Sequence, residues 1–226
     1  MMNTQSKTAT ARSARKFVWP LAVTLVAGAT LASWAVRAAE EEKILSGEYQ
    51  VSSATELSIE SGVGTIEFVR GDTDVITVRI VASRDEDSSW KDGDLSKVEL
   101  IAKQSGDELT LSVDEQDNIE LNWTVTMPRV STTVIELGVG QLSGELWTQD
   151  LDVELGVGEF DMTLFGNNYA FINAEVGIGE TRIRGTDKIT NERMFIASES
   201  YAEGEGDARI KVEVGIGEID IEVDAR

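Results

Sequence analysis

Hydrophobic and polar residues alternate along most of the chain after residue 43, and this alternation is interrupted at pairs of glycines. Alternation over about 4–8 residues is typical of a strand with one buried face. In one stretch Val153, Leu155 and Val157 alternate with polar residues, and the pattern resumes one step out of phase at Phe160. Glycine tolerates the backbone conformations that a corner needs. The pattern therefore predicts strand, corner and strand.

This unit recurs as an internal repeat, at residues 58–68, 134–144, 152–162, 173–183 and 211–221, each centred on Gly-Val-Gly or Gly-Ile-Gly. In the last four copies the first glycine is Gly138, Gly156, Gly177 and Gly215. Because the last interval is about twice as long as the earlier ones, we expect one degenerate coil around Met194–Tyr201, followed by a polar loop. A period of about 20 residues is typical of a solenoid, in which each coil stacks on its neighbours.

Both glycines of each copy are expected to be structural. Replacing Gly156 by valine is expected to destabilise the coil if the φ of Gly156 is positive. The ten positions are Gly62, Gly64, Gly138, Gly140, Gly156, Gly158, Gly177, Gly179, Gly215 and Gly217.

The predicted fold is all-β: a single-stranded β-solenoid of short strands with Gly-x-Gly corners. We expect one domain over 39–226, with regular repeats over 131–226 and a less regular β section over 39–130. Gly-Asp turns punctuate that first section, and residues 84–94 suit a longer exposed loop. Strands are expected in it at 49–59, 66–68, 75–82, 98–102, 109–113 and 122–127.

The N-terminal residues have the pattern of a targeting segment. Basic residues precede an uncharged stretch from Phe17 to Val36, and no acidic residue precedes Glu40. This pattern predicts a signal peptide over 1–38. The alternative is an uncleaved anchor, because the stretch approaches the roughly 20 apolar residues that span a bilayer. In both cases we expect the rest of the chain to be exported, in the periplasm or at the surface of a bacterium.

The charge of the chain restricts its partners. It has 20 basic and 41 acidic residues, and five of the basic ones precede residue 39, which leaves 15 against 41 and a charge of −26. Such a charge opposes binding to nucleic acid and to anionic lipid. We therefore expect no nucleic-acid partner, and membrane contact only through a retained N-terminal segment.

The residue types leave little room for catalysis. The sequence has no histidine and no cysteine, so catalytic triads, thiol chemistry and ordinary zinc sites are not expected. The Gly-Val-Gly turns lack the spacing of nucleotide-binding loops. We predict a protein that is not an enzyme, with no catalytic residue, no cofactor and no metal-site residue. The alternative is a polysaccharide-active enzyme that uses paired carboxylates.

A glutamate stands two positions before the first glycine of every copy. Alternation places it on the outer face, and stacking would set neighbouring glutamates about 4.8 Å apart. One hypothesis is a carboxylate ladder that binds Ca²⁺ or a basic partner, and the other is a solvated face that discourages aggregation. A second, weaker calcium motif is the Gly-Glu-Gly-Asp at 204–207. The glutamates are Glu60, Glu136, Glu154, Glu175 and Glu213.

Three tryptophans lie beyond the targeting segment. Trp90, in the predicted loop, could stack on a sugar ring or a protein partner. Trp123 and Trp147 are expected to pack in the core or at a cap.

The segments LNWTVTMPRVSTTVIELGVGQLSGEL (121–146), VELGVGEFDM (153–162) and VEVGIGEIDIEV (212–223) carry a family resemblance. The chain from about 45 to 226 resembles the toast-rack or GIN-type "putative adhesin" domains of bacterial envelope proteins. Those domains often have Asp after the turn, where this chain has Glu, Gln or Thr. The resemblance implies a single-stranded β-solenoid of unknown activity.

The function expected from the sequence is that of an exported, non-enzymatic cell-envelope protein, an adhesin-like scaffold or binding module for an envelope protein or glycan. The alternatives are a polysaccharide-active or carbohydrate-binding β-helix protein and an envelope protein that binds divalent cations, Ca²⁺ in particular.

Overall fold

A computed structural model describes residues 42–84, 93–114 and 118–226. The predicted targeting segment 1–38 and the Trp90 loop lie outside these ranges, apart from a few residues at the ends of the loop. Within the described residues, no helix has the length and apolarity to cross a membrane.

Twelve strands and one short 3-10 helix, η1 (Leu95–Lys97), make up the described chain, and all the strands belong to one hydrogen-bonded sheet. The strands are β1 (Glu42–Gln50), β2 (Glu56–Arg70), β3 (Val75–Arg84), β4 (Leu100–Ser105), β5 (Glu108–Val113), β6 (Ile119–Met127), β7 (Thr132–Trp147), β8 (Asp150–Phe165), β9 (Tyr169–Arg184), β10 (Ile189–Met194), β11 (Ala197–Glu203) and β12 (Ala208–Asp224).

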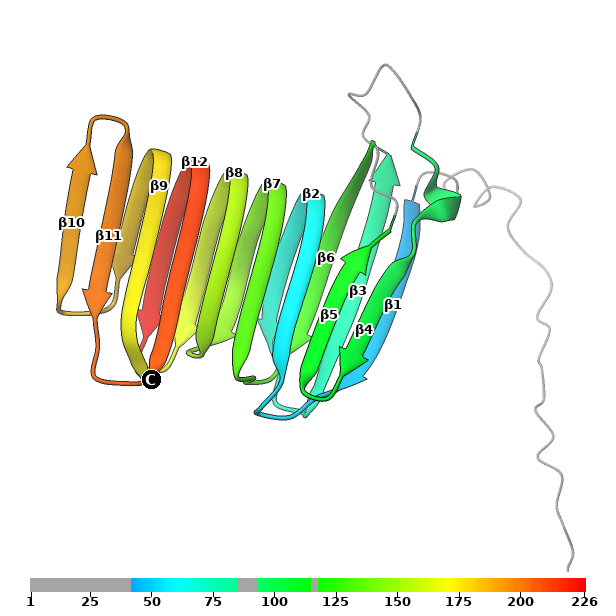
Figure 1. The fold of residues 1–226 in the computed structure, drawn as a ribbon, viewed down its shortest axis with the longest axis horizontal. Helices are drawn as coiled ribbons and strands as arrows, with labels where there is room; N and C mark the ends of the chain where they lie inside the picture. The colour runs from blue at the N-terminus through cyan, green and yellow to red at the C-terminus, as the bar shows by residue number, and fades with distance from the viewer. Residues whose placement is uncertain (1–41, 85–92, 115–117) are drawn as a thin grey trace, which may run out of the picture. The chain divides into compact units, whose positions relative to one another are not determined.

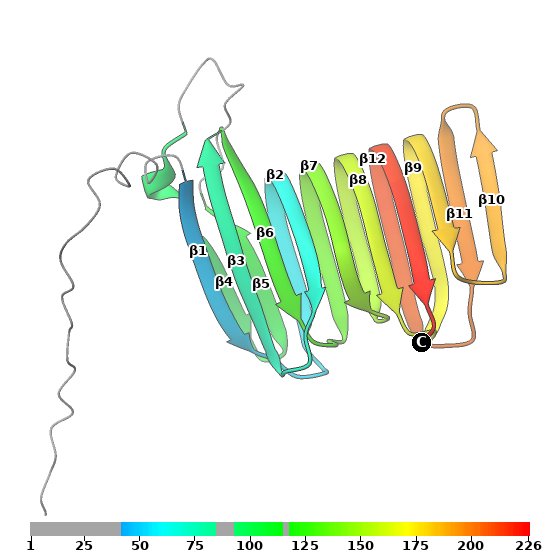
Figure 2. The same ribbon diagram turned by 180° about the vertical axis from the view of Figure 1, so that it is seen from behind.

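Five long strands, β2, β7, β8, β9 and β12, each contain one copy of the repeat and bend at its glycine pair (Figures 1 and 2). Each therefore has a first arm before the bend and a second arm after it. The first arms form one layer, called layer A, which β5 and β4 extend at one end and β11 and β10 at the other. The second arms form layer B, which β6, β3 and β1 extend. The predicted all-β, solenoid-like fold with Gly-x-Gly corners is confirmed.

The core lies between the two layers. In β8, Val153 and Leu155 face inward from the first arm and Phe160 and Met162 from the second, and all four are buried. Equivalent residues of neighbouring coils pair in parallel register, so that each inward row is apolar along the sheet. Such rows remove large apolar areas from water, at about 25 cal/mol per Å². A single coil has no second neighbour to complete this burial, which is why the coils occur in series.

The order of coils in space differs from their order in the sequence. The last strand, β12, lies between β8 and β9 and pairs in parallel with both. The expected degenerate coil around Met194–Tyr201 is wrong, because this segment belongs to the β10–β11 hairpin, which pairs antiparallel with the first arm of β9. The long interval between Gly177 and Gly215 thus contains an end hairpin and a return connection, not a missing coil.

The two glycines of a copy are required for different reasons. The second glycine has a positive φ in every copy, 149° at Gly158, and a Cβ there would overlap the carbonyl oxygen of Gly140 in the next coil. The φ of Gly156 is not positive, so backbone strain is not the reason for this glycine. A Cβ at Gly156 would instead overlap the carbonyl oxygen of Gly138, so close approach of the coils excludes a side chain.

The first β section agrees in part with the sequence. The predicted strand 49–59 is wrong as one element, because a turn at 51–55 separates β1 from β2. Thr55 is buried in this turn, and its hydroxyl accepts a hydrogen bond from the Ser52 amide. The other five predicted strands lie within or overlap β2, β3, β4, β5 and β6. The β2 coil stacks directly on β7, although β3, β4, β5 and β6 all lie between them in the chain.

Candidate binding groove

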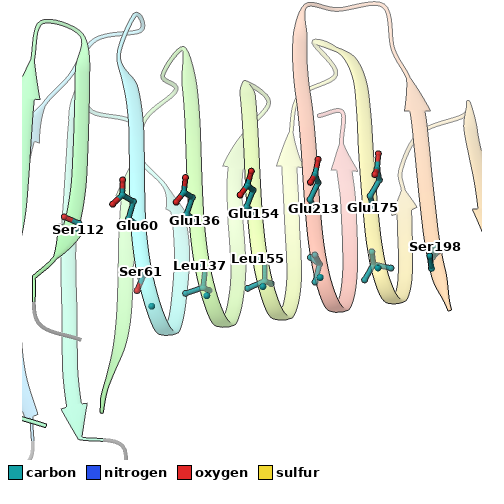
Figure 3. Close-up of a pocket in the computed structure, with 18 of the residues that line it drawn as sticks. Glu60, Ser61, Ser112, Glu136, Leu137, Glu154, Leu155, Glu175, Ser198 and Glu213 are labelled. Carbon is teal, nitrogen blue, oxygen red and sulfur yellow. The ribbon is translucent and has the colours of Figure 1, made fainter. Parts of the chain in front are cut away.

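The glutamate of each repeat copy points outward from layer A and is exposed, as predicted. Strand register places these side chains directly beside one another on neighbouring coils. Figure 3 shows the five side chains in a line, with Ser112 at one end and Ser198 near the other. Because β12 is inserted before β9, their spatial order is Glu60, Glu136, Glu154, Glu213 and Glu175.

The row continues through two glutamates that the repeat does not contain. Glu199 of β11 pairs with Glu175, and Glu192 of β10 pairs with Glu199, both in antiparallel register. Directly paired residues point to the same face of a sheet, and both side chains are exposed. The glutamate row, as we call it, therefore comprises seven consecutive in-register carboxylates. Sequence periodicity could not identify the last two, because no glycine motif accompanies them.

A groove of about 1280 Å³ runs along the glutamate row on layer A. Its floor is open over the five coils because the next outward position after each repeat glutamate is the first glycine of the corner, which has no side chain. Ile101, Lys103 and Ser112 of β4 and β5 line one end of the groove, and Arg193 and Ser198 of β10 and β11 line the other. The groove therefore crosses the strands.

The row has little compensating positive charge. Among the described lining residues only Lys103 and Arg193 are basic, and Arg193 already forms an ion pair of 2.9 Å with Glu180. Asn173 donates a hydrogen bond of 2.6 Å to Glu175. At a spacing of about 4.8 Å, unscreened neighbouring carboxylates repel by about 1 kcal/mol in water-like dielectric. The row is therefore a site where a cationic partner would relieve repulsion.

The geometry of the row is linear. Within the described ranges, no group of three or more His, Cys, Asp or Glu residues converges closely enough to hold a metal ion. Ca²⁺ takes six to eight oxygen ligands around one point, whereas the row presents its carboxylates side by side. Residues 204–207 connect β11 to β12, and the Gly204 and Gly206 amides donate to the carbonyls of Ala170 and Tyr169. Calcium binding stays a prediction from the sequence.

An exposed apolar ridge follows the corners beside the groove. Val157 continues the apolar alternation of Val153 and Leu155 in the sequence, but its side chain is 43% exposed on the outside of the bend. The equivalent residues of the other four coils are exposed to a similar extent and stand in register with it. Beyond the ridge, Glu159, Glu218 and Glu180 form a second, shorter acidic row. The ridge comprises Val63, Val139, Val157, Ile216 and Ile178.

The two tryptophans within the described ranges do not line the groove. Trp123 is 1% exposed in the core, and Trp147 lies at the far end of its second arm, where the Arg70 guanidinium stands 4.7 Å from its ring centroid. Arg70 also pairs with Glu145 at 3.0 Å. The predicted core position is confirmed for Trp123. Trp147 is partly exposed on a middle coil and so lies neither in the core nor at a cap, and Trp90 lies outside the described residues.

Comparison with known proteins gives similarities of structure only. No family model matches the chain, and no curated protein matches it in sequence. A solved structure from Clostridium sporogenes, named "a putative cell adhesion protein", aligns with 81% of this chain and 99% of its own, at 15% identity and a TM-score of 0.45. A "putative adhesin" from Parabacteroides merdae aligns with 55% of this chain and 54% of its own, at 7% identity and a TM-score of 0.30.

A "putative adhesin" from Bacteroides fragilis aligns with 79% of this chain and 97% of its own, at 11% identity and a TM-score of 0.22. The word adhesin belongs to the names of those proteins. What the present chain binds depends on its own residues.

Proposed function

We propose that this protein is a non-enzymatic binding module of the bacterial cell envelope, which holds a basic protein partner along the groove of layer A. One observation carries the proposal: seven in-register glutamates line a groove that crosses the strands, with two basic residues among the described lining residues. A partner with several Lys or Arg side chains would replace repulsion between carboxylates by attraction. Complementary charge of this kind raises association rates and selects partners by sign.

The groove favours binding over catalysis. A glycosidase needs two carboxyl groups in different surroundings, so that one is protonated while the other is ionised. The three central glutamates of the row, Glu136, Glu154 and Glu213, stand in equivalent, exposed positions on equivalent coils, so their surroundings do not distinguish an acid from a base among them. Export to the envelope rests on the sequence of residues 1–38, and the adhesin-like role rests on the family resemblance.

The test uses a matched pair of variants with the same change in charge. The groove variant combines Glu136→Gln, Glu154→Gln and Glu213→Gln in the middle of the row. The control combines three exposed glutamates outside the row, Glu48→Gln, Glu67→Gln and Glu222→Gln. Each protein is used for cross-linked capture from the envelope fraction and is titrated with a lysine-rich peptide of about 20 residues, long enough to cross the row.

We expect the groove variant to lose at least about tenfold in affinity for the peptide and to lose a basic envelope protein from the capture, because three central carboxylates are neutralised. The control should change both by less than about twofold. Equal losses in the two variants would show that only the net charge acts. Capture of a glycan alone, unchanged by the groove variant, would contradict a basic protein partner.

A further inference from the structure

The end of the sheet formed by β9, β10 and β11 is staggered between the two layers. In layer A, β11 and β10 continue the sheet beyond β9. In layer B, the second arm of β9 from Ile178 to Arg184 pairs with β12 alone among the described strands, and the Gly179 amide at its start donates to the Ile196 carbonyl in the turn between β10 and β11. Layer A therefore extends two strands further than layer B, and Figures 1 and 2 show the hairpin as the last element at this end.

We call this difference of two strands the step. From it we infer that a second copy of the chain binds at this end and forms a two-fold symmetric dimer interface, called the joint. In the joint, each copy places β10 beside the second arm of the other copy's β9. An edge strand offers unpaired backbone groups to another strand, and addition of a strand to such an edge is a common mode of association. The occupant is a second copy because the step complements itself.

The complementarity follows from strand order and direction. A two-fold rotation about an axis parallel to the strands exchanges layers A and B and leaves strand directions unchanged. Each layer of the joint then runs from one copy into the other without a gap or an overlap, because both steps are two strands deep. β10 runs parallel to the first arm of β9 and hence opposite to the second arm. The two new strand pairs are antiparallel and equivalent to each other, as the symmetry of a two-fold dimer requires.

The other end of the sheet does not fit this step. There layer B continues from β2 through β6, β3 and β1, whereas layer A continues through β5 and β4. At this end layer B extends only one strand further than layer A. If this end were stacked head-to-tail on the β9–β11 end of another copy, where layer A extends two strands further, the layers would leave a gap or clash. A closed dimer is therefore favoured over an open filament.

The charge of this end also permits self-association. The chain has 20 basic and 41 acidic residues, whereas residues 180–203 contain four basic and five acidic ones. Repulsion between two acidic copies is therefore lower here than the net charge of the whole chain would give. On the edge, outward Arg182 and Arg184 of one copy would face outward Glu192 and Thr190 of the other. Arg182 and Arg184 already contact Asp220 on their other side, at 2.9 and 2.8 Å.

Contacts between the β9 second arm and β11 fix the position of the hairpin relative to layer B. The Thr181 hydroxyl, on the inner face of the β9 second arm, lies 2.9 and 2.7 Å from the hydroxyls of Ser198 and Ser200 on β11. The hairpin is thus fixed to β9. Asn191 and Arg193 on the inner face of β10 are exposed, and Arg193 pairs with Glu180 at the start of the β9 second arm at 2.9 Å. In the joint, the partner's hairpin would cover these two side chains.

The first measurement is the mass of the purified protein in solution by analytical ultracentrifugation. We expect a dimer at protein concentrations up to about 100 µM, corresponding to at least micromolar affinity. Glu192→Arg should weaken dimerisation by at least about tenfold, because it sets two cations side by side across the joint. Glu199→Arg is the matched control, since Glu199 is the in-register neighbour of Glu192 but lies one strand away from the edge. A monomer, or equal effects of the two variants, would overturn the inference.

Cysteine cross-linking tests the register directly, because the chain contains no cysteine. A mixture of the single variants Arg184→Cys and Thr190→Cys should form a disulfide-linked heterodimer, since the joint brings these positions together within disulfide reach. Each variant alone, and a mixture of either with the exposed mid-sheet variant Asp152→Cys, should not. Absence of the heterodimer from a dimeric protein would place the interface elsewhere. These results do not depend on the groove, so they stand or fall separately from the proposed function.

Discussion

At the scale of single residues, the corner glycines determine how closely the coils stack. A residue other than glycine with a φ of 149° is strained, and at Gly158 a Cβ would also overlap the carbonyl oxygen of Gly140 in the next coil. Gly106 provides a comparison. Its φ is 61°, but a Cβ there would meet no atom within 4 Å. A substitution at Gly106 therefore tests backbone strain alone, whereas one at Gly158 tests backbone strain together with contact between coils.

We expect Gly158→Ala to lower the free energy of unfolding by about 3 kcal/mol or more, because neither the backbone nor the neighbouring coil can adjust without losing ladder hydrogen bonds. Gly106→Ala should cost about 1 kcal/mol, from the backbone conformation alone. Denaturant unfolding of both variants measures the difference. Similar losses in the free energy of unfolding for the two substitutions would mean that contact between coils is not what excludes a side chain at Gly158.

The glutamate row should cost stability in the absence of a partner. Glu154 has a carboxylate neighbour on each side, Glu136 and Glu213, whereas exposed Glu67 faces Thr124 and Ser143. We expect Glu154→Gln to raise the free energy of unfolding by about 0.5–1 kcal/mol at low ionic strength and by less at about 1 M salt, where charges are screened within about 3 Å. Glu67→Gln should have little effect at either salt concentration. A gain that persisted at high salt would point to a cause other than repulsion.

At the scale of elements, β12 joins two parts of the sheet. It pairs with β8 on one side and with β9 on the other along nearly its whole length, and its inward residues Ile210, Val212, Ile219 and Ile221 are fully buried. Without it, β9 and its hairpin would have no described strand partner connecting them to the rest of the sheet. The last strand of the described chain therefore completes the middle of the described sheet.

We expect a chain that ends at Asp207 to lose protection of β9, β10 and β11 from proteolysis, because no other strand of the described sheet links them to β8. Limited proteolysis followed by mass spectrometry would locate the cleavage sites. The control is a chain that ends at Asp224, which lacks only Ala225 and Arg226 and retains the whole of β12. Resistance of the shorter chain to cleavage within 169–203 would contradict this role for β12.

At the scale of the whole described β unit, both sections of the chain share one core. The cluster of buried side chains runs from Leu57 to Val223 and includes residues of the first β section, such as Ile80 and Trp123. Solenoids with a continuous core unfold cooperatively when the coupling between coils is strong. We expect one calorimetric transition for residues 42–226. Two separated transitions would show that the first section folds independently.

Several features could be read from the sequence because they depend on local periodicity. Alternation with a phase change at glycine predicts two-armed coils, as at Val153 and Phe160, since the period of a strand is fixed by backbone geometry. The same alternation places Glu154 outward. Repetition of similar coils predicts the all-β solenoid class, because similar units stack by burying the same rows.

Other features were decided only by tertiary structure, because they depend on which distant segments pair. The insertion of β12 between β8 and β9, the antiparallel β10–β11 hairpin and the extension of the glutamate row to Glu199 and Glu192 all result from long-range register. Gly156 needs to be glycine because of a neighbouring coil and not because of its own φ. Local sequence specifies the shape of each coil, whereas the order of the coils depends on the total burial and hydrogen bonding of the assembled sheet.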